Sequence, residues 1–257
     1  MKIKFYKIEC LTNLHVGSSE VNYNIVDNEV EKDAVTGLPI IHASGVKGAL
    51  RDALSQVMKS DEIKKIFGAE GQKNEADSGS HKFLDALLVS RPMRVWGSAE
   101  KASVSVATQA SVNLLLDTLN AFGVSSFGDS RLPEIKFGDN EFLTTCDEAL
   151  SVENEKTGKL DIAAKDALAR LKTVLGKDLA VAKTFDGYDL PVVARNCLKG
   201  SGNLWYEEVV PRGSVLFFAI ICPDDACDDL PIPEIVQFGG NASVGCGFTK
   251  ITKIAER

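Results

Sequence analysis

Alternating apolar and polar residues predict strands near both ends of the chain. Residues 2–11 (KIKFYKIECL) mix β-branched and aromatic residues with charged ones and precede a turn-rich loop, which predicts a strand. The uninterrupted apolar run VLFFAIIC at 215–222 predicts a strand that is buried on both faces. A last strand is expected at about 246–254, after a glycine-rich loop. Segments with a helical pattern lie between these strands.

Three segments repeat apolar residues at steps of three and four, which predicts helices. The first is expected from about 45 to 58, with Ser44 as its N-cap and an apolar stripe that ends at Val57. The other two are expected at 108–121 and 161–175. Helices placed between terminal strands are typical of a domain that mixes both kinds of element.

Segments rich in glycine, proline and polar residues predict loops and a hairpin. Residues 70–81 are expected to form an exposed loop, and the alternating pieces of 184–213 predict an extended hairpin. IPEIVQ at 232–237 predicts a short helix or turn. This order of elements favours an α+β fold. A ferredoxin-like sheet with large insertions fits it, and so does another α+β arrangement.

Composition narrows the class of protein. The chain has 257 residues, of which 44% are hydrophobic, so it can bury a core without covalent staples. No apolar run approaches the roughly 18 residues of a membrane span, and we expect a cytoplasmic protein without membrane contact. The 6 cysteines include no C-x-x-C pair, which predicts reduced and mostly buried thiols.

The excess of acidic over basic residues limits the kinds of ligand that the whole surface can bind. The formal net charge of −7 argues against a positive surface that binds nucleic acid indiscriminately. A local site needs only a few cations and backbone N–H groups, and the helix start with Ser44, Lys47 and Arg51 combines both. The glycine-rich loop at 239–247 could offer unpaired N–H groups to phosphate. A solvated helix face and a tight turn are the simpler interpretations.

These features coincide with a resemblance to a known family. LTNLHVGS at 11–18 and IVDNEVEKDAVTGLPIIHASGVKGALRDAL at 25–54 resemble the opening of RAMP-superfamily proteins. LPVVARNCL, NLWYEEVVP and QFGGNASVGCGF are similar to later blocks of one branch, the backbone subunits of type III-B CRISPR effector (Cmr) complexes, known as Cmr subunit four. The glycine-rich loop is shared by many RAMPs, whereas the order of the other blocks is specific to this branch.

The resemblance implies a fold and a set of partners. It implies one RAMP domain over 1–257, with a ferredoxin-like (RRM-like) palm, an insertion around 60–180 and a projecting thumb β-hairpin around 183–204. Copies of the chain would stack head to tail along a CRISPR guide RNA beside other Cmr complex subunits. Each thumb would intrude between guide and target RNA. The residues that could wedge against bases are Phe185, Tyr188, Leu190 and Pro191.

The resemblance also implies a nuclease site. Asp27 matches the cleaving aspartate of the family, and would hold a divalent Mg²⁺ or Mn²⁺ ion or deprotonate a ribose 2′-hydroxyl. His15 is a candidate acid or base, and Glu207 or Glu208 a second carboxylate, although a structural histidine and a solvated strand end would also fit. The residues expected to bind RNA are Ser44, Lys47, Arg51, Arg195, Asn196, Gly239, Gly240, Gly245 and Gly247.

Two other functions fit the same residues. A purely structural RNA-binding protomer would protect the guide without producing target fragments. A standalone nuclease that processes CRISPR RNA precursors would use His15 or His42 for acid–base chemistry, and would cut repeat RNA without a metal ion.

Overall fold

The chain divides into two compact units in the computed structural model. Unit 1 comprises Met1–Leu87, Leu190–Arg212 and Phe217–Arg257, and unit 2 comprises Leu88–Asp189 and Gly213–Leu216. The structure describes residues 1–17, 25–69, 78–94, 103–124, 142–144, 149–153, 169, 171–177, 179–182, 190–197, 203–223 and 230–257. Within these residues no helix is long and apolar enough to cross a membrane.

A sheet formed by the two ends of the chain is the centre of unit 1. Strand β1 (Lys2–Cys10) pairs antiparallel with β13 (Phe248–Glu256), and hydrogen bonds between Ile3 and Arg257 extend this pairing. On the other side of β1 lies β11 (Val215–Cys222), which is almost entirely buried. The predicted strands at 2–11, 215–222 and 246–254 are confirmed.

The outer edge of this sheet corrects one prediction. β12 (Ile235–Gln237) pairs antiparallel with β13, whereas a short helix or turn was expected at 232–237. β-Branched Ile235 and Val236 favour a pleated strand, and Val236 buries its side chain there. Two short strands, β2 (Ile40–Ile41) and β3 (Lys82–Phe83), complete the sheet contacts of unit 1.

Helix α1 (Ala43–Ser55) covers part of this sheet, and α2 (Ser60–Phe67), which the sequence patterns did not predict, packs beside it. The N-cap position belongs to His42, so the assignment of that position to Ser44 is wrong. Asp85, distant in sequence, accepts the Ala43 N–H at 2.6 Å and serves as the cap. The helix can start earlier than predicted because this carboxylate satisfies a free N–H group.

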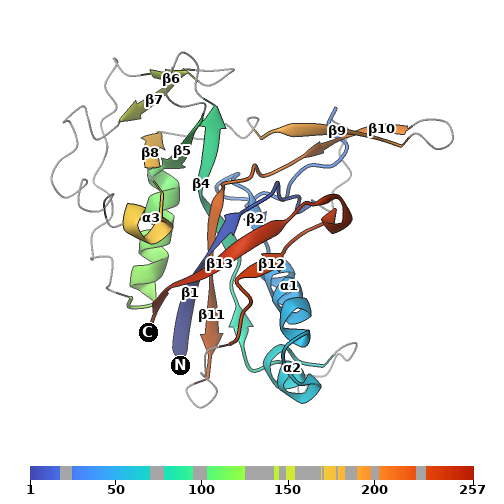
Figure 1. Cartoon of the computed structure of the whole chain (residues 1–257). Coiled ribbons are helices and arrows are strands. Elements are labelled where there is room, and N and C mark those ends of the chain that lie inside the picture. The colour runs from blue at the N-terminus through green and yellow to red at the C-terminus, as the bar shows by residue number, and fades with distance from the viewer. Residues whose placement is uncertain are drawn as a thin grey trace. The chain divides into compact units, whose positions relative to one another are not determined.

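A two-stranded ribbon extends from unit 1 (Figure 1). Strands β9 (Val192–Cys197) and β10 (Asn203–Glu208) pair antiparallel, in agreement with the predicted hairpin. Leu190 was expected to wedge against bases. It is buried, so its side chain packs within the domain. Phe185 and Tyr188 lie outside the described residues.

Unit 2 is built on β4 (Ala86–Arg94), whose first two residues belong to unit 1, and on β5 (Ser103–Thr108), which pairs antiparallel with it. Thr108 ends β5 and caps α3 (Gln109–Ala121) by accepting the Ser111 N–H at 3.0 Å. The helix predicted at 108–121 is therefore confirmed.

Three short strands continue the sheet of unit 2. β8 (Leu179–Ala182) pairs parallel with β5, and β7 (Ala149–Glu153) pairs antiparallel with β8 and with β6 (Phe142–Thr144). Residues 169 and 171–175 are helical, in agreement with the helix predicted at 161–175, and the rest of that segment lies outside the described residues. The described elements combine α-helices with mostly antiparallel strands.

The burial of α1 allows a direct test of its packing. Leu50 is 0% exposed, whereas Val57, which the sequence pattern placed in the same stripe, is 61% exposed beyond the helix end. We expect Leu50→Ala to lower the free energy of unfolding by about 2–5 kcal/mol, because it leaves a cavity. Val57→Ala should change it by less than about 0.5 kcal/mol in the same urea titration. Equal effects would contradict this account of α1.

Candidate functional site

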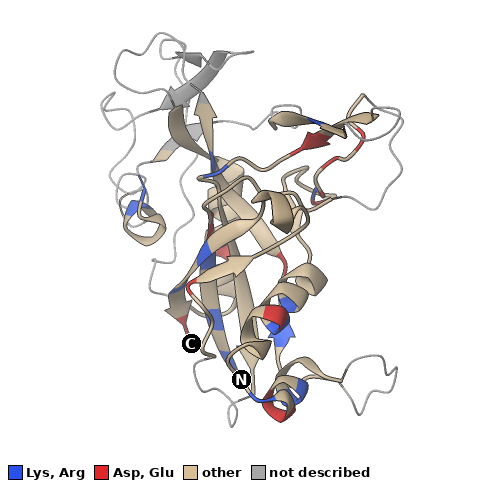
Figure 2. Ribbon diagram, turned by 45° about the vertical axis from the view of Figure 1, so that its right-hand side comes forward, with Lys and Arg blue, Asp and Glu red and all other residues tan. Residues whose placement is uncertain are grey.

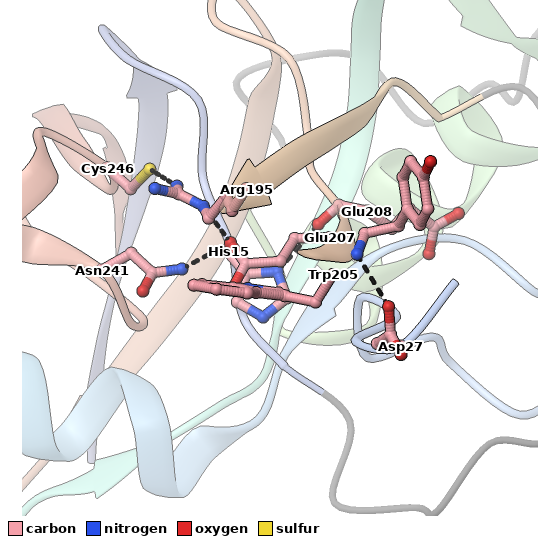
Figure 3. Close-up of polar contacts among 9 residues, drawn as sticks. His15, Asp27, Arg195, Trp205, Glu207, Glu208, Asn241 and Cys246 are labelled. Atoms are coloured by element: carbon pink, nitrogen blue, oxygen red, sulfur yellow. Dashed lines mark hydrogen bonds and ion pairs between the residues drawn. The ribbon is translucent and has the colours of Figure 1, made fainter. Parts of the chain in front are cut away.

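Asp27 lies at the base of the ribbon, where its carboxylate is exposed. The Asp27 N–H donates to the Tyr206 carbonyl at 3.0 Å, and the Tyr206 N–H donates to Asp27 Oδ2 at 2.8 Å (Figure 3). The next residue, Asn28, forms a parallel bridge with Glu207. The chain therefore runs along β10 at this point, and the ribbon orients an acidic side chain that solvent can reach.

His15 lies just beyond the end of β1 and is largely buried. Its Nδ1 is 2.8 Å from the Glu208 carbonyl oxygen. A carbonyl oxygen can only accept, so Nδ1 carries hydrogen, and when the ring is uncharged its lone pair lies on Nε2. No hydrogen-bond partner of Nε2 occurs among the described residues. The ring can therefore accept a proton at Nε2 while its orientation stays fixed.

Glu208 anchors the segment that follows Asp27. Its carboxylate accepts the Val30 N–H at 3.0 Å, and the Lys32 ammonium lies 3.1 Å from Oε1 and 3.0 Å from Oε2. The side chains of Glu207 and Glu208 belong to residues that are only 5% and 6% exposed, so the interpretation as a solvated strand end is wrong. Both oxygens of Glu208 serve an internal contact, and its catalytic role stays a prediction.

The buried Glu207 carboxylate is the centre of a hydrogen-bond network (Figure 3). Its carboxylate accepts from Arg195 Nε, from Trp205 Nε1 at 2.9 Å and from Asn241 Nδ2 at 2.9 Å. Burial raises the pKa of the Glu207 carboxyl. The hydrogen bonds from Trp205 and Arg195 and the charges of Arg195 and His15 outweigh burial, and hold that pKa below its usual value.

Arg195 and Asn196, both expected to bind RNA, lie in β9 in different surroundings. The half-buried Arg195 guanidinium lies between the Glu207 carboxylate and the Cys246 thiol. Its Nη2 atom is 3.3 Å from Cys246 Sγ. Asn196 is exposed, and it faces Leu204 across the ribbon. RNA binding by either residue stays a prediction.

The glycine-rich loop uses its amides within the chain. The Gly240 N–H donates to the His15 carbonyl at 2.9 Å, the Gly247 N–H to the Asn13 carbonyl at 2.8 Å, and the Gly245 N–H to the Ala242 carbonyl at 3.0 Å. The expectation that these groups are unpaired is therefore wrong.

Two of these glycines permit a close approach of the backbone to itself. A Cβ atom at Gly239 would clash with the His15 carbonyl oxygen, and one at Gly247 would clash with the Phe238 carbonyl oxygen. Both glycines also have positive φ. The loop is thus fitted tightly against the end of β1, and its contact with RNA stays a prediction.

The start of α1 is already compensated by acidic groups. The Asp85 carboxylate accepts a hydrogen bond from the Ala43 N–H, and Glu31 Oε1 lies 3.2 Å from His42 Nε2. Ser44 is exposed in the first turn, and Lys47 and Arg51 are half-buried. In Figure 2 α1 carries both basic and acidic residues, while the inner end of β10 is acidic. A phosphate would therefore approach a helix start where negative charge is already present.

A groove of about 470 Å³ lies between α1 and the stretch that leads to the glycine-rich loop. Of the described residues that line it, only Asp52 is charged, so the groove does not itself favour phosphate. Its wall comprises Gly45, Ala49, Asp52, Ala53, Gln56, Pro233, Ile235, Val236, Gln237, Gly239 and Phe248.

The buried carboxylate of Glu207 predicts a pH dependence of stability. Its folded pKa is below the reference value of 4.5, so its contribution is present above that pH and is lost as pH falls through the folded pKa. We expect Glu207→Gln to lower the free energy of unfolding at pH 7 by about 1–3 kcal/mol and to flatten its decline in acid. Urea titrations at pH 7, 5 and about 3.5 measure both effects.

Glu234→Gln is the matched control for this measurement. The Glu234 carboxyl also has a lowered pKa, through the hydrogen bond and charge of Lys250, but it is fully exposed. Solvent screening should leave little effect of its substitution. An acid profile of Glu207→Gln that matches the wild type would refute the role assigned to the network.

Comparisons with known proteins agree over nearly the whole chain. Residues 7–250 match the RAMP superfamily. The chain is 27% identical to the CRISPR system Cmr endoribonuclease Cmr4 of Pyrococcus furiosus over 292 aligned residues, which cover 98% of this chain and 96% of that protein.

Two solved structures are similar in fold. A chain of the type III-B Cmr-beta complex bound to cognate target RNA has a TM-score of 0.75 and 24% identity, and the match covers 98% of this chain and 97% of that chain. Oligomeric Cmr4 from Pyrococcus furiosus has a TM-score of 0.71 and 21% identity, with 99% of both chains covered. The likeness to Cmr subunit four is confirmed, and the protein belongs to the RAMP superfamily.

Proposed function

We propose that this protein is a backbone subunit of a type III-B CRISPR effector complex, which binds guide RNA and cleaves complementary target RNA. The full-length match to a protein named as a Cmr endoribonuclease supports the proposal. The observation that carries the nuclease part is the exposed Asp27 carboxylate, oriented by the Tyr206 peptide at the base of the ribbon.

In this proposal the strands of unit 1 form the ferredoxin-like palm, and the ribbon is the thumb. One face of the ribbon is well suited to unstack bases, because side chains alternate along a strand and Leu204 and Tyr206 point to the same side. They are 57% and 36% exposed, and they oppose Asn196 and Ala194 across the ribbon. These residues replace Leu190 as the proposed wedge, because apolar and aromatic surfaces stack on bases of any sequence.

Asp27 and His15 supply the proposed chemistry. Splaying of a target base would free its ribose 2′-hydroxyl to attack the adjacent phosphorus in line. The O2′–P bond forms as the P–O5′ bond breaks, the 2′-hydroxyl proton passes to a base, and the 5′ oxygen leaves with a proton. The Asp27 carboxylate acts as base or orients the hydroxyl, and His15 Nε2 can exchange the second proton.

A divalent ion, Mg²⁺ or Mn²⁺, fits the carboxylate donor of Asp27. Tyr206 occupies one carboxylate oxygen, and the other has no partner among the described residues. No cluster of three or more His, Cys, Asp or Glu residues that could hold a metal occurs in the described part of the chain. Asp27 would therefore share the ion with RNA phosphate and water, as Mg²⁺ sites often do. A bound ion would neutralise charge on the phosphate.

The proposed partners are guide RNA, target RNA, further copies of this chain and other Cmr complex subunits. The match to an oligomeric Cmr4 supports self-association. The proposed RNA contacts include the α1 face with Lys47 and Arg51, and Asn196 on the ribbon. Cations of this kind position a nucleic-acid backbone without reading its sequence.

Substitution of Asp27 tests the nuclease part. We expect Asp27→Asn in the assembled complex to reduce the rate of target cleavage by about 10²–10⁴-fold, because the amide cannot act as a base or hold a cation well. Assembly and guide content should stay unchanged, since an amide oxygen can still accept the Tyr206 N–H. Denaturing gels of labelled target RNA in Mg²⁺ or Mn²⁺ measure the rate.

One result would refute the role of Asp27, and two others would point to the other candidate functions. Target cleavage at the wild-type rate by Asp27→Asn would refute the role of Asp27. Guide protection by a wild-type complex that never cuts its target would indicate a structural protomer. Specific cutting of repeat RNA by the isolated chain in EDTA would indicate a processing nuclease.

Reversal of charge on α1 tests the proposed path of the guide. Lys47→Glu with Arg51→Glu should weaken guide binding and reduce the slope of log K against log salt by about 1.4, since each lost single-strand contact removes about 0.7. Lys64→Glu with Lys65→Glu makes the same change of charge on exposed positions of α2, and should leave the slope nearly unchanged. Equal slopes for both pairs would place the guide elsewhere.

A further inference from the structure

The side chain of Asn241 connects the glycine-rich loop to the base of the ribbon. Its Nδ2 donates to Glu207 Oε2 at 2.9 Å. Glu207 directly follows Tyr206, whose N–H binds the Asp27 carboxylate at 2.8 Å and whose carbonyl accepts the Asp27 N–H at 3.0 Å. The anchored carboxylate and the peptide that orients Asp27 therefore belong to neighbouring residues of one strand.

The backbone conformation of Asn241 indicates that its side chain matters. With φ 62° and ψ 28°, it is the only non-glycine residue with positive φ in the described part of the chain. Asparagine in this conformation commonly hydrogen-bonds to its own turn, but here the side chain does not cap the following 3₁₀ turn, Ala242–Val244. It reaches Glu207 instead. Glycine would adopt this backbone more easily, so the side-chain contact explains the asparagine.

Asn241 differs from the other two donors to the Glu207 carboxylate. Arg195 and Trp205 face each other across β9 and β10, so they hold the carboxylate within the ribbon. Asn241 comes from a loop that is itself fixed to the end of β1 by the Gly240 N–H. Its hydrogen bond therefore ties the ribbon to the glycine-rich loop, as does the weaker contact of the Arg195 guanidinium with the Cys246 thiol, whereas His15 Nδ1 joins the Glu208 carbonyl of the ribbon to the segment after β1.

We propose that Asn241 is a positioning residue for the nuclease site, which acts through Glu207 and the Tyr206 peptide on Asp27. This inference rests on the proposed function, because Asp27 needs a fixed position only if the protein cleaves RNA. The glycine-rich loop then connects the segment after β1 to the ribbon and limits the movement of the ribbon. Small displacements of a reacting group are costly, since a shift of about 1 Å can reduce a rate by about a hundredfold.

Two glycine substitutions in the same turn distinguish the loss of the Asn241–Glu207 hydrogen bond from a general increase in loop flexibility. Asn241→Gly removes the hydrogen bond to Glu207 and adds no backbone strain, because glycine adopts positive φ freely. Val244→Gly loosens the same loop but keeps the link, and the Val244 side chain is exposed. A difference between these two variants therefore reports on the Asn241 side chain.

Hydrogen exchange in the full chain measures the link without any need for cleavage. We expect the amides of Tyr206, Asp27 and Asn28 to exchange faster in Asn241→Gly than in the wild type or in Val244→Gly. In the assembled complex with saturating target RNA, the single-turnover cleavage rate of Asn241→Gly should fall by about tenfold or more, with unchanged affinity for the target.

A reversed hydrogen bond provides a rescue. Asn241→Asp alone puts two carboxylates against each other and should slow cleavage. The double variant Asn241→Asp with Glu207→Gln gives an acceptor at 241 and a donor at 207, and should recover part of the lost rate. A merely destabilising change would not be relieved by a second substitution at this partner.

The outcomes are distinguishable. Unchanged exchange in Asn241→Gly would overturn the link, and faster exchange with an unchanged cleavage rate would overturn the positioning role. A wild-type complex that leaves target RNA intact would overturn the proposed function and the positioning role with it. The exchange comparison would still decide whether Asn241 holds the ribbon.

Discussion

The burial of two consecutive carboxylates at the base of the ribbon is the constraint on which the site depends. Successive side chains of a strand point to opposite faces. Glu207 therefore meets Arg195 and Asn241, while Glu208 meets Val30 and Lys32. A buried charge is destabilising unless it is paired and hydrogen-bonded, so separation of either carboxylate from its partners would cost free energy. The strand is held from both sides, and Asp27 is placed by the peptide just before this pair.

These internal pairs also bear on the acidity of the chain. The formal net charge of −7 counts every carboxylate, including those of Glu207 and Glu208, which are buried and bind partners within the chain. Carboxylates that are neutralised by Arg195 or Lys32 contribute little to the field that a polyanion meets at a distance. Total charge is therefore a poor guide to whether RNA can approach this surface, and the local arrangement decides it.

Local patterns predicted the elements whose apolar residues form a clear signal. The helix α3 carries them at helical spacing, β11 is an uninterrupted apolar run, and β1 is rich in β-branched and aromatic residues, so each was found close to its observed bounds. α2 was missed, because its 8 residues offer too short a pattern between polar neighbours. The start of α1 was misjudged, since its cap, Asp85, comes from a loop 42 positions away.

The candidate site was predictable in its residues but not in their partners. The resemblance pointed to Asp27, and acid–base chemistry added His15 and the two glutamates. All four lie near the base of the ribbon. The contacts of Glu207 with Asn241 join residues 34 positions apart, which no local pattern encodes. The glycines were recognised as points of close approach, but their neighbour is the chain itself at His15. An asparagine within a glycine-rich run is a signal for a left-handed residue that the predictions from sequence did not use.

The antiparallel pairing of β1 with β13 has a practical consequence. Both ends of the chain lie at the same end of this strand pair, where Ile3 and Arg257 exchange hydrogen bonds, and the nine residues of β1 separate them from Asn13 and His15. At about 3.3 Å per residue, this strand spans roughly 30 Å. A fluorescent label or affinity handle joined to residue 1 or to residue 257 would therefore lie remote from the base of the ribbon, and would report on assembly without contacting the candidate site.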